Sequence, residues 1–527
     1  MVAAALLLAA TFTRPLERVN SMDPIRAQSI YDSRAVLLVY ETPLAIDYVA
    51  RPYRLVPGLC ELPEVSADGR TYVFRMREKL RVESGELRVE SGELRVESGE
   101  SRVESGELRV GNGDGDAPLT SRDVARCLER LRDPANASPG GWTMKAVASF
   151  ATPDDDTLVV TLKEPSHVFP WMMAMSYTAV RRADGTGTGP YRLASWRKNH
   201  EMVFTRRTPV PGGFDTIRYL VINDVSTQWL MFLRGELDFL GEIARDNWDA
   251  VVADDGTLDP RLAAEGVRLY GTPSLDVRYI GMNMRDPVLG PNRKLRQALT
   301  CAFDFAAWRK FYNGRVDFAD GPVPHGVDGR LETPFPYPFD LDRAKALLAE
   351  AGYADGLDPA TGRRLTLTLS IGRASQDSRE QGELLASFFE RIGVRLELAF
   401  STWGTFLKSV NEGRVQLYMM GWVGDYPDAE NFLQLFYSKN ASPGPNHSNY
   451  ANAAFDAEYE AAMAAPDAAA RNVHWRACQA ILREDCPWIY THFPKSYTLV
   501  RPTVENYIPS DFPYGQEQYL KAGATAR

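Results

Sequence analysis

Residues 364–400 constrain the fold of this chain more than any other stretch. Residues 365–371 alternate between apolar and polar side chains, which predicts a half-buried strand. Apolar residues at helical spacing then follow between residues 384 and 392, and Gly393 suits the end of that helix. A second alternating run covers residues 394–400. A strand, a helix and a strand in this order make a βαβ unit, so we expect an α/β fold.

The next segment predicts one more helix and one more strand. Ser401 or Thr402 suits the N-cap of a short helix that ends near Gly413. Residues 415–422, VQLYMMGW, then predict a buried strand.

Polar and aromatic side chains follow the ends of these predicted strands. Arg373 comes just after the first strand, Trp403 begins the short helix, and Trp422 and Asp425 lie at and just past the end of the last strand. Open α/β sheets bind ligands beyond the carboxyl ends of their strands. The set suits a small zwitterion, with its carboxylate at Arg373, its amine at Asp425 and its apolar groups against the tryptophans.

Each of these residues also has an ordinary structural alternative. Asp425 suits the cap of the helix that follows, or a turn with Pro427. Trp422 suits a hydrophobic core, and Arg373 suits a solvated loop. Their convergence on one rim favours a binding site.

The sequence has no pattern that indicates an enzyme or a metal centre. The six histidines include no H-x-x-x-H pair, and no G-x-S-x-G elbow is present. A net charge of -9 does not favour a nucleic-acid partner. No apolar run approaches the roughly 18 residues of a membrane span. These features favour a binding protein with no catalytic residues, metal or cofactor.

Two features bear on the cell compartment. Residues 2–12 suit the apolar core of a signal peptide, which predicts a signal remnant over residues 1–19, with a buried first element as the alternative. Cys478 and Cys486 could pair in an oxidising compartment. The remaining cysteines fit small buried hydrophobes: Cys60, Cys127 and Cys301.

Residues 81–108 consist of four near-identical copies of one heptapeptide. Its apolar residues, as in Val82 and Leu87, recur with alternating gaps of five and two, whereas a coiled coil needs gaps of three and four. Each copy also holds a Ser-Gly pair, and glycine costs about 1 kcal/mol inside a helix. The pattern therefore predicts a short strand and a turn, repeated. An adhesive arm that docks a partner is the alternative.

Several blocks of the chain resemble, in order, the extracellular solute-binding proteins of family 5, which are the peptide- and nickel-binding receptors of ABC importers. Residues 421–438, GWVGDYPDAENFLQLFYS, resemble the signature of that family. Further matching blocks lie at residues 20–44, 51–78, 116–134, 187–196, 279–284, 295–308 and 340–353.

The resemblance implies a two-lobed, periplasmic-binding-protein-like α/β fold of type II, in its large peptide-binding variety, with a hinged ligand cleft. The first lobe would combine residues 20–273 with a return segment, residues 495–527, and the second lobe would cover residues 274–494. The repeat would be a loop insertion at residues 81–110 of the first lobe. Such an insertion is tolerable because the entropic cost of closing a loop grows slowly with its length.

The resemblance also implies roles for single residues. Peptide-binding members use an aspartate at the position of Asp425, beside Trp422, for the amine of the ligand. Arg373 falls near the region where dipeptide-binding members hold the carboxylate. Tyr40 and Glu41 match a first-lobe segment near the cleft.

The function implied is that of a substrate-binding receptor, a periplasmic monomer that captures a dipeptide or oligopeptide and delivers it to the permease subunits of an ABC transporter in the inner membrane. Oligopeptide-binding members carry basic residues at the positions of Val410 and Met419, so the apolar residues here argue against long peptides. Other ligands in the family are a nickel complex, an opine, an oligosaccharide or haem. An enzyme on a similar fold, and a sensor or chaperone, are the alternatives from other classes.

Overall fold

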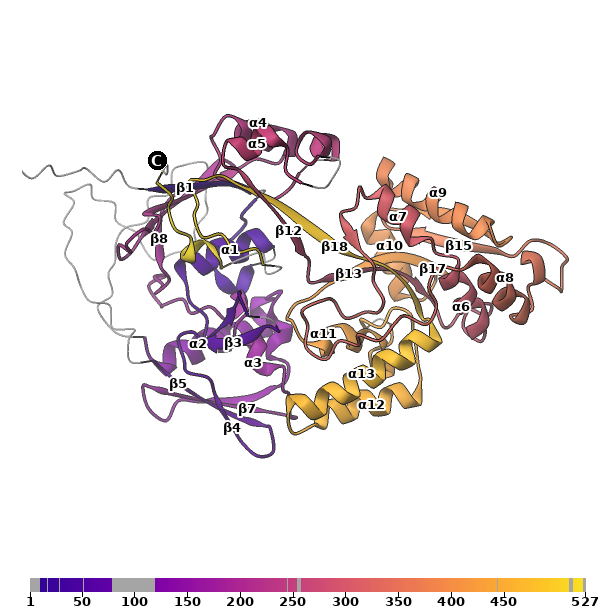
Figure 1. Ribbon diagram of the computed structural model, residues 1–527. Coiled ribbons are helices and arrows are strands. Elements are labelled where there is room, and N and C mark those ends of the chain that lie inside the picture. Colours follow the sequence, from indigo (N-terminus) through magenta and orange to yellow (C-terminus); the bar gives the residue numbers. More distant parts are fainter. Residues whose placement is uncertain are drawn as a thin grey trace, which may run out of the picture. The chain divides into compact units, whose positions relative to one another are not determined.

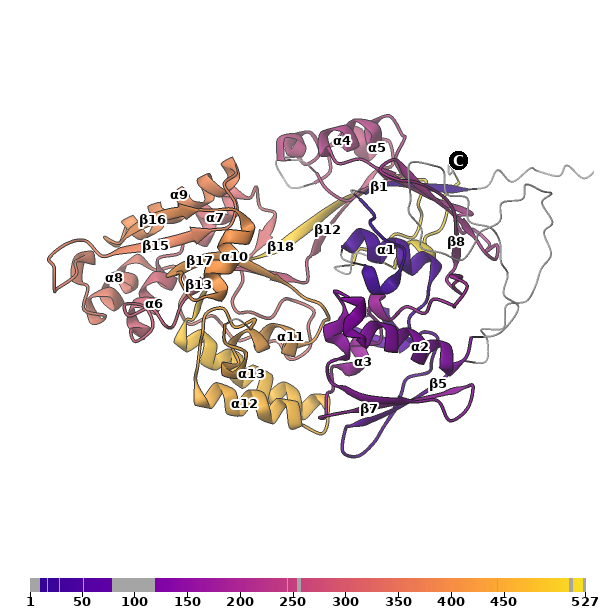
Figure 2. The same ribbon diagram turned by 180° about the vertical axis from the view of Figure 1, so that it is seen from behind.

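The computed structural model describes residues 10–524, apart from residues 17, 28, 51, 78–118, 244, 254–256, 443 and 511–514. The heptapeptide repeat at residues 81–108 lies outside the described residues. Contacts between Cα atoms divide the chain into two compact units, whose elements are labelled in Figures 1 and 2. Unit 1 comprises Met1–Ala50, Arg54–Thr272 and Ser496–Arg527, and unit 2 comprises Arg51–Tyr53 and Pro273–Lys495.

Unit 1 contains a four-stranded sheet in the order β1-β10-β9-β8. Strand β1 runs parallel to β10, and the other neighbours are antiparallel. Alternate side chains of this sheet, such as Phe12, Phe204 and Ile217, are fully buried in one core together with residues of helix α1. The bounds are Thr11–Leu16 (β1), Tyr191–Arg197 (β8), Glu201–Arg206 (β9), Thr216–Val221 (β10) and Ile30–Val39 (α1).

Strand β1 falls within residues 1–19, the stretch that the sequence assigns to a signal remnant. Residues 11–16 pair in continuous register with residues 216–221, and Phe12 is fully buried. This stretch is therefore part of the folded unit, as the alternative of a buried first element predicts. Residues 1–9 lie outside the described residues.

The rest of unit 1 consists of a second four-stranded sheet, β4-β5-β7-β6, a two-stranded sheet, β2-β3, and short helices. The strands are Leu44–Asp47 (β2), Arg54–Pro57 (β3), Glu64–Val65 (β4), Thr71–Arg75 (β5), Val147–Ala151 (β6), Thr157–Leu162 (β7), Phe239–Leu240 (β11) and Arg268–Pro273 (β12). The helices are Ser121–Arg132 (α2), Phe169–Met172 (α3), Val225–Leu233 (α4) and Pro260–Ala264 (α5).

Unit 2 is organised by most of an eight-stranded sheet, whose main path is β11-β18-β13-β17-β15-β16, with β12 and β14 paired to β18. Strands β11 and β12 of this sheet come from the unit 1 segment. Strand β18 is long and passes from unit 2 into unit 1. The strands of unit 2 are Asp276–Met282 (β13), Val316–Asp317 (β14), Thr366–Ile371 (β15), Arg395–Phe400 (β16), Leu417–Val423 (β17) and Trp488–Val500 (β18).

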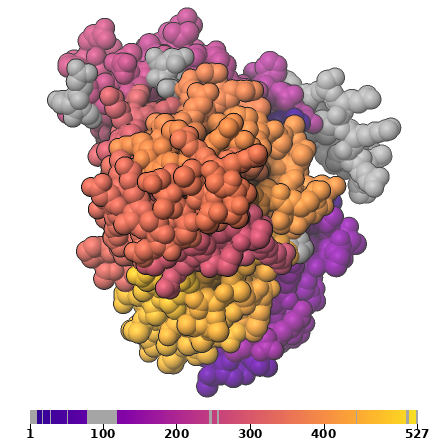
Figure 3. Space-filling model, turned by 90° about the vertical axis from the view of Figure 1, so that its right-hand side faces the viewer, coloured from indigo at the N-terminus to yellow at the C-terminus, as the bar shows by residue number. Residues whose placement is uncertain are grey.

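Two groups of helices pack on the sheet of unit 2. Side chains of α6, α8 and α9 share one core with β13, β15 and β16. On the opposite side the ring of Tyr279 stacks on that of Trp488 at 3.4 Å between centroids, and Phe436 lies 4.2 Å from Trp488. In Figure 3, α12 and α13 form one yellow layer of the surface. The helices are Arg293–Cys301 (α6), Phe305–Phe311 (α7), Leu341–Glu350 (α8), Gln376–Glu390 (α9), Trp403–Asn411 (α10), Ala429–Leu433 (α11), Ala453–Ala464 (α12) and Ala468–Asp485 (α13).

The predicted βαβ unit is confirmed by β15, α9 and β16. Strands β15 and β16 pair in parallel, with Leu367 opposite Leu396. The side chain of Ser375 accepts a hydrogen bond from Ser378 N at 3.3 Å and caps α9. Gly393 has a φ of 85°, and a Cβ there would lie 2.5 Å from the carbonyl oxygen of Asp355, so only glycine fits this turn. The predicted helix after Thr402 and the predicted strand at residues 415–422 are also confirmed, as α10 and as β17, which covers Leu417–Val423.

The possible pairing of Cys478 with Cys486 is wrong. All five cysteines are free and buried. Cys478 lies inside α13 and Cys486 directly follows its last residue. Eight residues of helix separate the two by about 12 Å along the axis, whereas a disulfide requires Cα atoms within about 7 Å.

The described part of the chain contains no helix long and apolar enough to span a membrane. Within the same residues, no three His, Cys, Asp or Glu side chains are grouped as metal ligands.

Candidate functional site

The candidate site lies at one edge of the sheet in unit 2. Strands β15, β16 and β17 run parallel, so their carboxyl ends meet at the same edge (Figure 1). Arg373 follows β15, Trp403 follows β16, and Trp422 and Asp425 lie at and after the end of β17. The fold therefore brings these four residues to the edge where open α/β sheets bind ligands.

Asn431 connects Trp422 with Asp425. Its Oδ1 accepts one hydrogen bond from Trp422 Nε1 at 2.9 Å and another from the backbone N of Asp425 at 3.2 Å. Asn431 is fully buried in α11, so its position is set by the helix. Both sequence-predicted residues are thus held by one amide oxygen.

The hydrogen bonds exclude the alternative in which Asp425 caps α11. The cap is Asp428, whose Oδ1 accepts a hydrogen bond from Glu430 N at 2.9 Å. Trp422 is half-buried. Of the structural alternatives, the one in which Asp425 caps α11 therefore does not apply.

The Asp425 carboxylate is half-buried, and no cation among the described residues pairs with it. Burial raises the pKa of Asp425. The amide of Asn431 opposes this shift, although its Nδ2 makes no hydrogen bond to any described residue. A partly desolvated carboxylate without a cation is a ready acceptor for an ammonium group.

Gly372, the residue before Arg373, lies against the ring of Trp403. A Cβ on Gly372 would meet Trp403 Cε3 at 2.9 Å and Phe406 Cδ1 at 2.7 Å, so glycine allows the loop to approach these rings. The Trp403 side chain is 57% exposed and contacts Phe406, with 5.4 Å between the ring centroids. Arg373 is exposed, and no acid in the described part of the chain pairs with it. The exposed indole thus lies against the backbone residue that precedes Arg373.

Tyr40 and Glu41 belong to unit 1 and follow α1. The Tyr40 hydroxyl donates to the carbonyl oxygen of Gly185 at 3.1 Å, so this side chain has a structural role. Glu41 is half-buried and lines a cavity of about 180 Å³. Burial raises the pKa of Glu41, while Thr188, Arg77 and Arg207 lower it.

Sequence reasoning missed Asn431 and Arg278. Arg278 lies on β13 directly opposite Gly421 of β17, close to the same edge. Its Nη2 pairs with Asp276 Oδ2 at 2.8 Å. The signal for Arg278 is a charge two residues after Asp276 in a strand whose remaining residues carry none, whereas nothing in the sequence marks Asn431.

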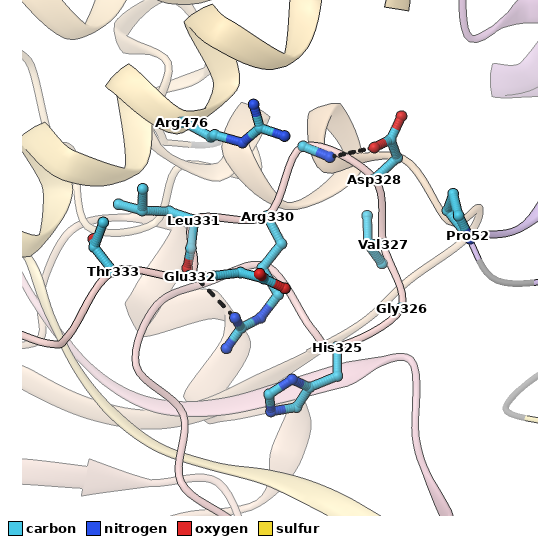
Figure 4. Close-up of a pocket in the computed structure, with 11 residues that line it drawn as sticks. Pro52, His325, Gly326, Val327, Asp328, Arg330, Leu331, Glu332, Thr333 and Arg476 are labelled. Carbon is cyan, nitrogen blue, oxygen red and sulfur yellow. Dashed lines mark hydrogen bonds between the residues drawn. The ribbon is translucent and has the colours of Figure 1, made fainter. Parts of the chain in front are cut away.

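A larger hollow, of about 640 Å³, lies elsewhere in unit 2 between the loop of residues 325–333 and Arg476 of α13 (Figure 4). None of the predicted site residues lines it. The figure shows the Arg330 guanidinium bonded to the Leu331 carbonyl, and this side chain also pairs with Asp320 at 2.5 Å. Arg330 therefore holds the loop in place.

Comparison with known proteins gives the family. The model of the bacterial extracellular solute-binding proteins, family 5, matches residues 54–444. Heme-binding protein A of Haemophilus influenzae is 25% identical over 87% of this chain and 82% of its own length. The dipeptide-binding protein of Escherichia coli is 23% identical over 91% of this chain and 88% of its own length.

Solved structures show the same fold at low identity. HbpA2 from Haemophilus parasuis matches with a TM-score of 0.80 at 22% identity, over 97% of this chain and 99% of that one. The unliganded open form of MppA, a periplasmic murein tripeptide binding protein, matches with a TM-score of 0.77 at 20% identity, over 98% of this chain and 97% of that one. The chain has the two-lobed fold of periplasmic binding proteins, and it belongs to the bacterial extracellular solute-binding proteins of family 5.

Proposed function

We propose that this protein is the substrate-binding receptor of an ABC importer and that its ligand is a small peptide. One observation carries the proposal: the half-buried Asp425 carboxylate lies at the carboxyl edge of the sheet without a cation of its own among the described residues, and Asn431 binds the Asp425 backbone beside Trp422. The curated relatives include a dipeptide-binding protein and two di/tripeptide-binding proteins, which supports the peptide as ligand.

The peptide would bind through its two charged ends. Its ammonium group would pair with Asp425, and its carboxylate would pair with Arg373. Apolar side chains would contact the exposed face of Trp403 and the ring of Trp422. Tyr40 and Glu41 are candidate contacts from unit 1.

A short peptide fits better than a long one. Val410, one of the positions at which oligopeptide-binding members carry a basic residue, is fully buried in α10 and apolar. Met419, the other such position, lies inside β17 and packs on the core of unit 2. Neither side chain offers a charge to an extended peptide.

Haem is the second candidate ligand, because one relative of similar identity is named a heme-binding protein. The two ligands are easily separated by experiment, since haem absorbs strongly in the visible range and a dipeptide does not.

The remaining parts of the proposal concern location and partners. The family consists of bacterial extracellular solute-binding proteins, and one structural neighbour is an ABC transporter-associated periplasmic binding protein in complex with a peptide. We therefore infer a periplasmic receptor that works as a monomer, delivers its ligand unchanged to permease subunits in the inner membrane, and catalyses no reaction.

The test is calorimetric titration of the purified protein with a dipeptide library and with haemin, after mild denaturation and refolding to remove bound ligand. Mass spectrometry of the material released in the first step identifies what the protein carried. Micromolar or tighter binding of dipeptides, recovered intact, supports the proposal. Binding of haemin alone, or recovery of cleaved peptides, would overturn it.

A further inference from the structure

Arg278 lies at the candidate site but has no role in the binding scheme above. Strands β13 and β17 are antiparallel, and Arg278 pairs with Gly421, the residue before Trp422. Because side chains alternate along a strand, Arg278 projects from the same face as Ile280 and Met419, and Trp422 from the other face. Ile371, two residues before Arg373, packs in the core on the face of Ile280.

The guanidinium of Arg278 lies directly on the backbone of β17. A Cβ on Gly421 would lie 2.5 Å from Arg278 Nη1 and 2.6 Å from its Cδ. Any side chain at position 421 would therefore displace the arginine. The glycine of the Gly-Trp pair creates the space that Arg278 occupies at the sheet edge.

The ion pair with Asp276 does not use all the N–H donors of the Arg278 guanidinium. Its side chain is 42% exposed, and Asp276 is the one acid among the described residues that pairs with it. A guanidinium carries five N–H donors, and its two edges can hold two carboxylates at once. The neighbouring His492 does not compete for an anion, because burial, together with Arg278, lowers the pKa of His492 to about 3 and leaves it neutral.

Tyr312 adds a second donor beside Arg278. Its ring lies 4.7 Å from that of His492, and His492 pairs with Arg278 across β13 and β18. Burial raises the pKa of Tyr312 to about 12, with the nearby Arg278 acting in the opposite direction. The phenol therefore keeps its proton at neutral pH and is able to donate it to an anion.

We propose that Arg278, assisted by the Tyr312 hydroxyl, forms an anion subsite that selects peptides with an acidic carboxyl-terminal residue. This inference rests on the proposed function. In a zwitterionic peptide the main-chain carboxylate is matched by Arg373 and the ammonium by Asp425. An Asp or Glu side chain adds one negative charge, and Arg278 is an additional cation at this edge that can receive it.

The experiment compares two dipeptides of equal shape, Ala-Glu and Ala-Gln, by calorimetric titration at neutral pH and low salt. We expect the wild-type protein to bind Ala-Glu about tenfold more tightly than Ala-Gln, because hydrogen bonds to charged groups are the stronger ones. In Arg278→Gln this ratio should fall to about one, while the affinity for Ala-Gln stays within about twofold of the wild-type value. In Tyr312→Phe the ratio should fall only in part, by about two- to threefold.

Two further variants separate charge from structure. Arg278→Lys keeps the charge and should retain a preference for Ala-Glu. Arg395→Gln removes an exposed arginine at the opposite end of β16, where Arg395 pairs with Glu397, and should leave the ratio unchanged. Melting curves of all four variants show whether each protein is folded at the temperature of the titration.

The outcomes distinguish the two proposals. If no protein binds either dipeptide, the proposed function fails and this inference fails with it. If both dipeptides bind and the ratio survives in Arg278→Gln, the inference alone is overturned. An equal loss of both affinities in Arg278→Gln would also overturn it, because Arg278 would then only support the strands.

Discussion

Asp425 in unit 2 and Glu41 in unit 1 are both half-buried carboxylates whose pKa is raised by burial, but their surroundings differ. Around Asp425 the one opposing effect comes from the neutral amide of Asn431. Around Glu41 the Thr188 hydroxyl opposes the shift first, and two cations, Arg77 and Arg207, lower the pKa further. The comparison teaches that burial alone does not mark a ligand-binding carboxylate. What marks it is a buried charge for which the protein supplies no counter-ion.

The largest effect that we expect is on ligand affinity in Asp425→Asn. The change removes the charge that would receive the ammonium group but keeps the size of the side chain. Loss of one partner of such a charge pair costs about 2–5 kcal/mol, which is roughly a 30- to 5,000-fold loss of affinity. Calorimetric titration with a dipeptide that the wild-type protein binds measures it.

The matched control is Asp428→Ala, three residues away. Asp428 caps α11, so its loss should lower stability by about 1 kcal/mol and leave affinity nearly unchanged. If Asp425→Asn lowers the melting temperature and keeps the affinity, Asp425 is a structural residue and its contrast with Glu41 does not hold.

The second largest effect should come from Asn431→Ala. This buried side chain supplies the oxygen that Trp422 Nε1 and the backbone N of Asp425 share. Both donors would lose this acceptor, which should lower the free energy of unfolding by about 1–3 kcal/mol for the pair together. We also expect weaker binding, because the carboxylate and the indole lose their common support. Chemical denaturation and titration of the same variant measure the two effects, and a change in stability with normal affinity would show that Asn431 does not position Asp425.

The β15–α9–β16 unit was predictable because its evidence is local: the alternation of apolar residues in each strand, the helical spacing between them and Gly393 at the turn. The position of the site residues then follows from the rule that parallel strands share their carboxyl edge. Both arguments need only the order of residues along the chain.

What could not be predicted depends on pairing between distant segments. Arg278 lies against Gly421 only because β13 pairs with β17 in one particular register, which neither strand reveals alone. Likewise, residues 11–16 fall within the predicted signal remnant, and only their pairing with β10 shows that they form a strand. Asn431 is an ordinary polar residue in a helical segment, and its role arises from burial.

A third, smaller effect concerns the stability of the ligand-free protein and its dependence on pH. Because the pKa of Asp425 is raised above its ordinary value of 3.8, the folded protein holds this proton more tightly than the unfolded chain does. Ionisation of Asp425 therefore destabilises the folded state as the pH rises through the ordinary value to the raised one. We expect Asp425→Asn to melt above the wild-type protein at pH 7.

The difference between the two melting temperatures should disappear near pH 3, where Asp425 is protonated in both the folded and the unfolded state. Melting curves from pH 3 to pH 7 measure it. If Asp425→Asn melts below the wild-type protein at pH 7, the carboxylate stabilises the free protein, and the idea of a charge kept unpaired for the ligand is wrong.

The smallest effect should be that of Glu41→Gln on ligand affinity, which we expect to change by less than about threefold, or roughly 0.5 kcal/mol. Arg77 and Arg207 already act on Glu41, so an arriving ammonium group would gain less from this carboxylate than from Asp425. Glutamine keeps the shape of the side chain and removes only the charge, as Asp425→Asn does in unit 2. Titration of both variants with the same dipeptide compares the two carboxylates directly. If Glu41→Gln loses as much affinity as Asp425→Asn, the ammonium group is held from unit 1 as well, and an existing counter-ion does not disqualify a carboxylate from binding ligand.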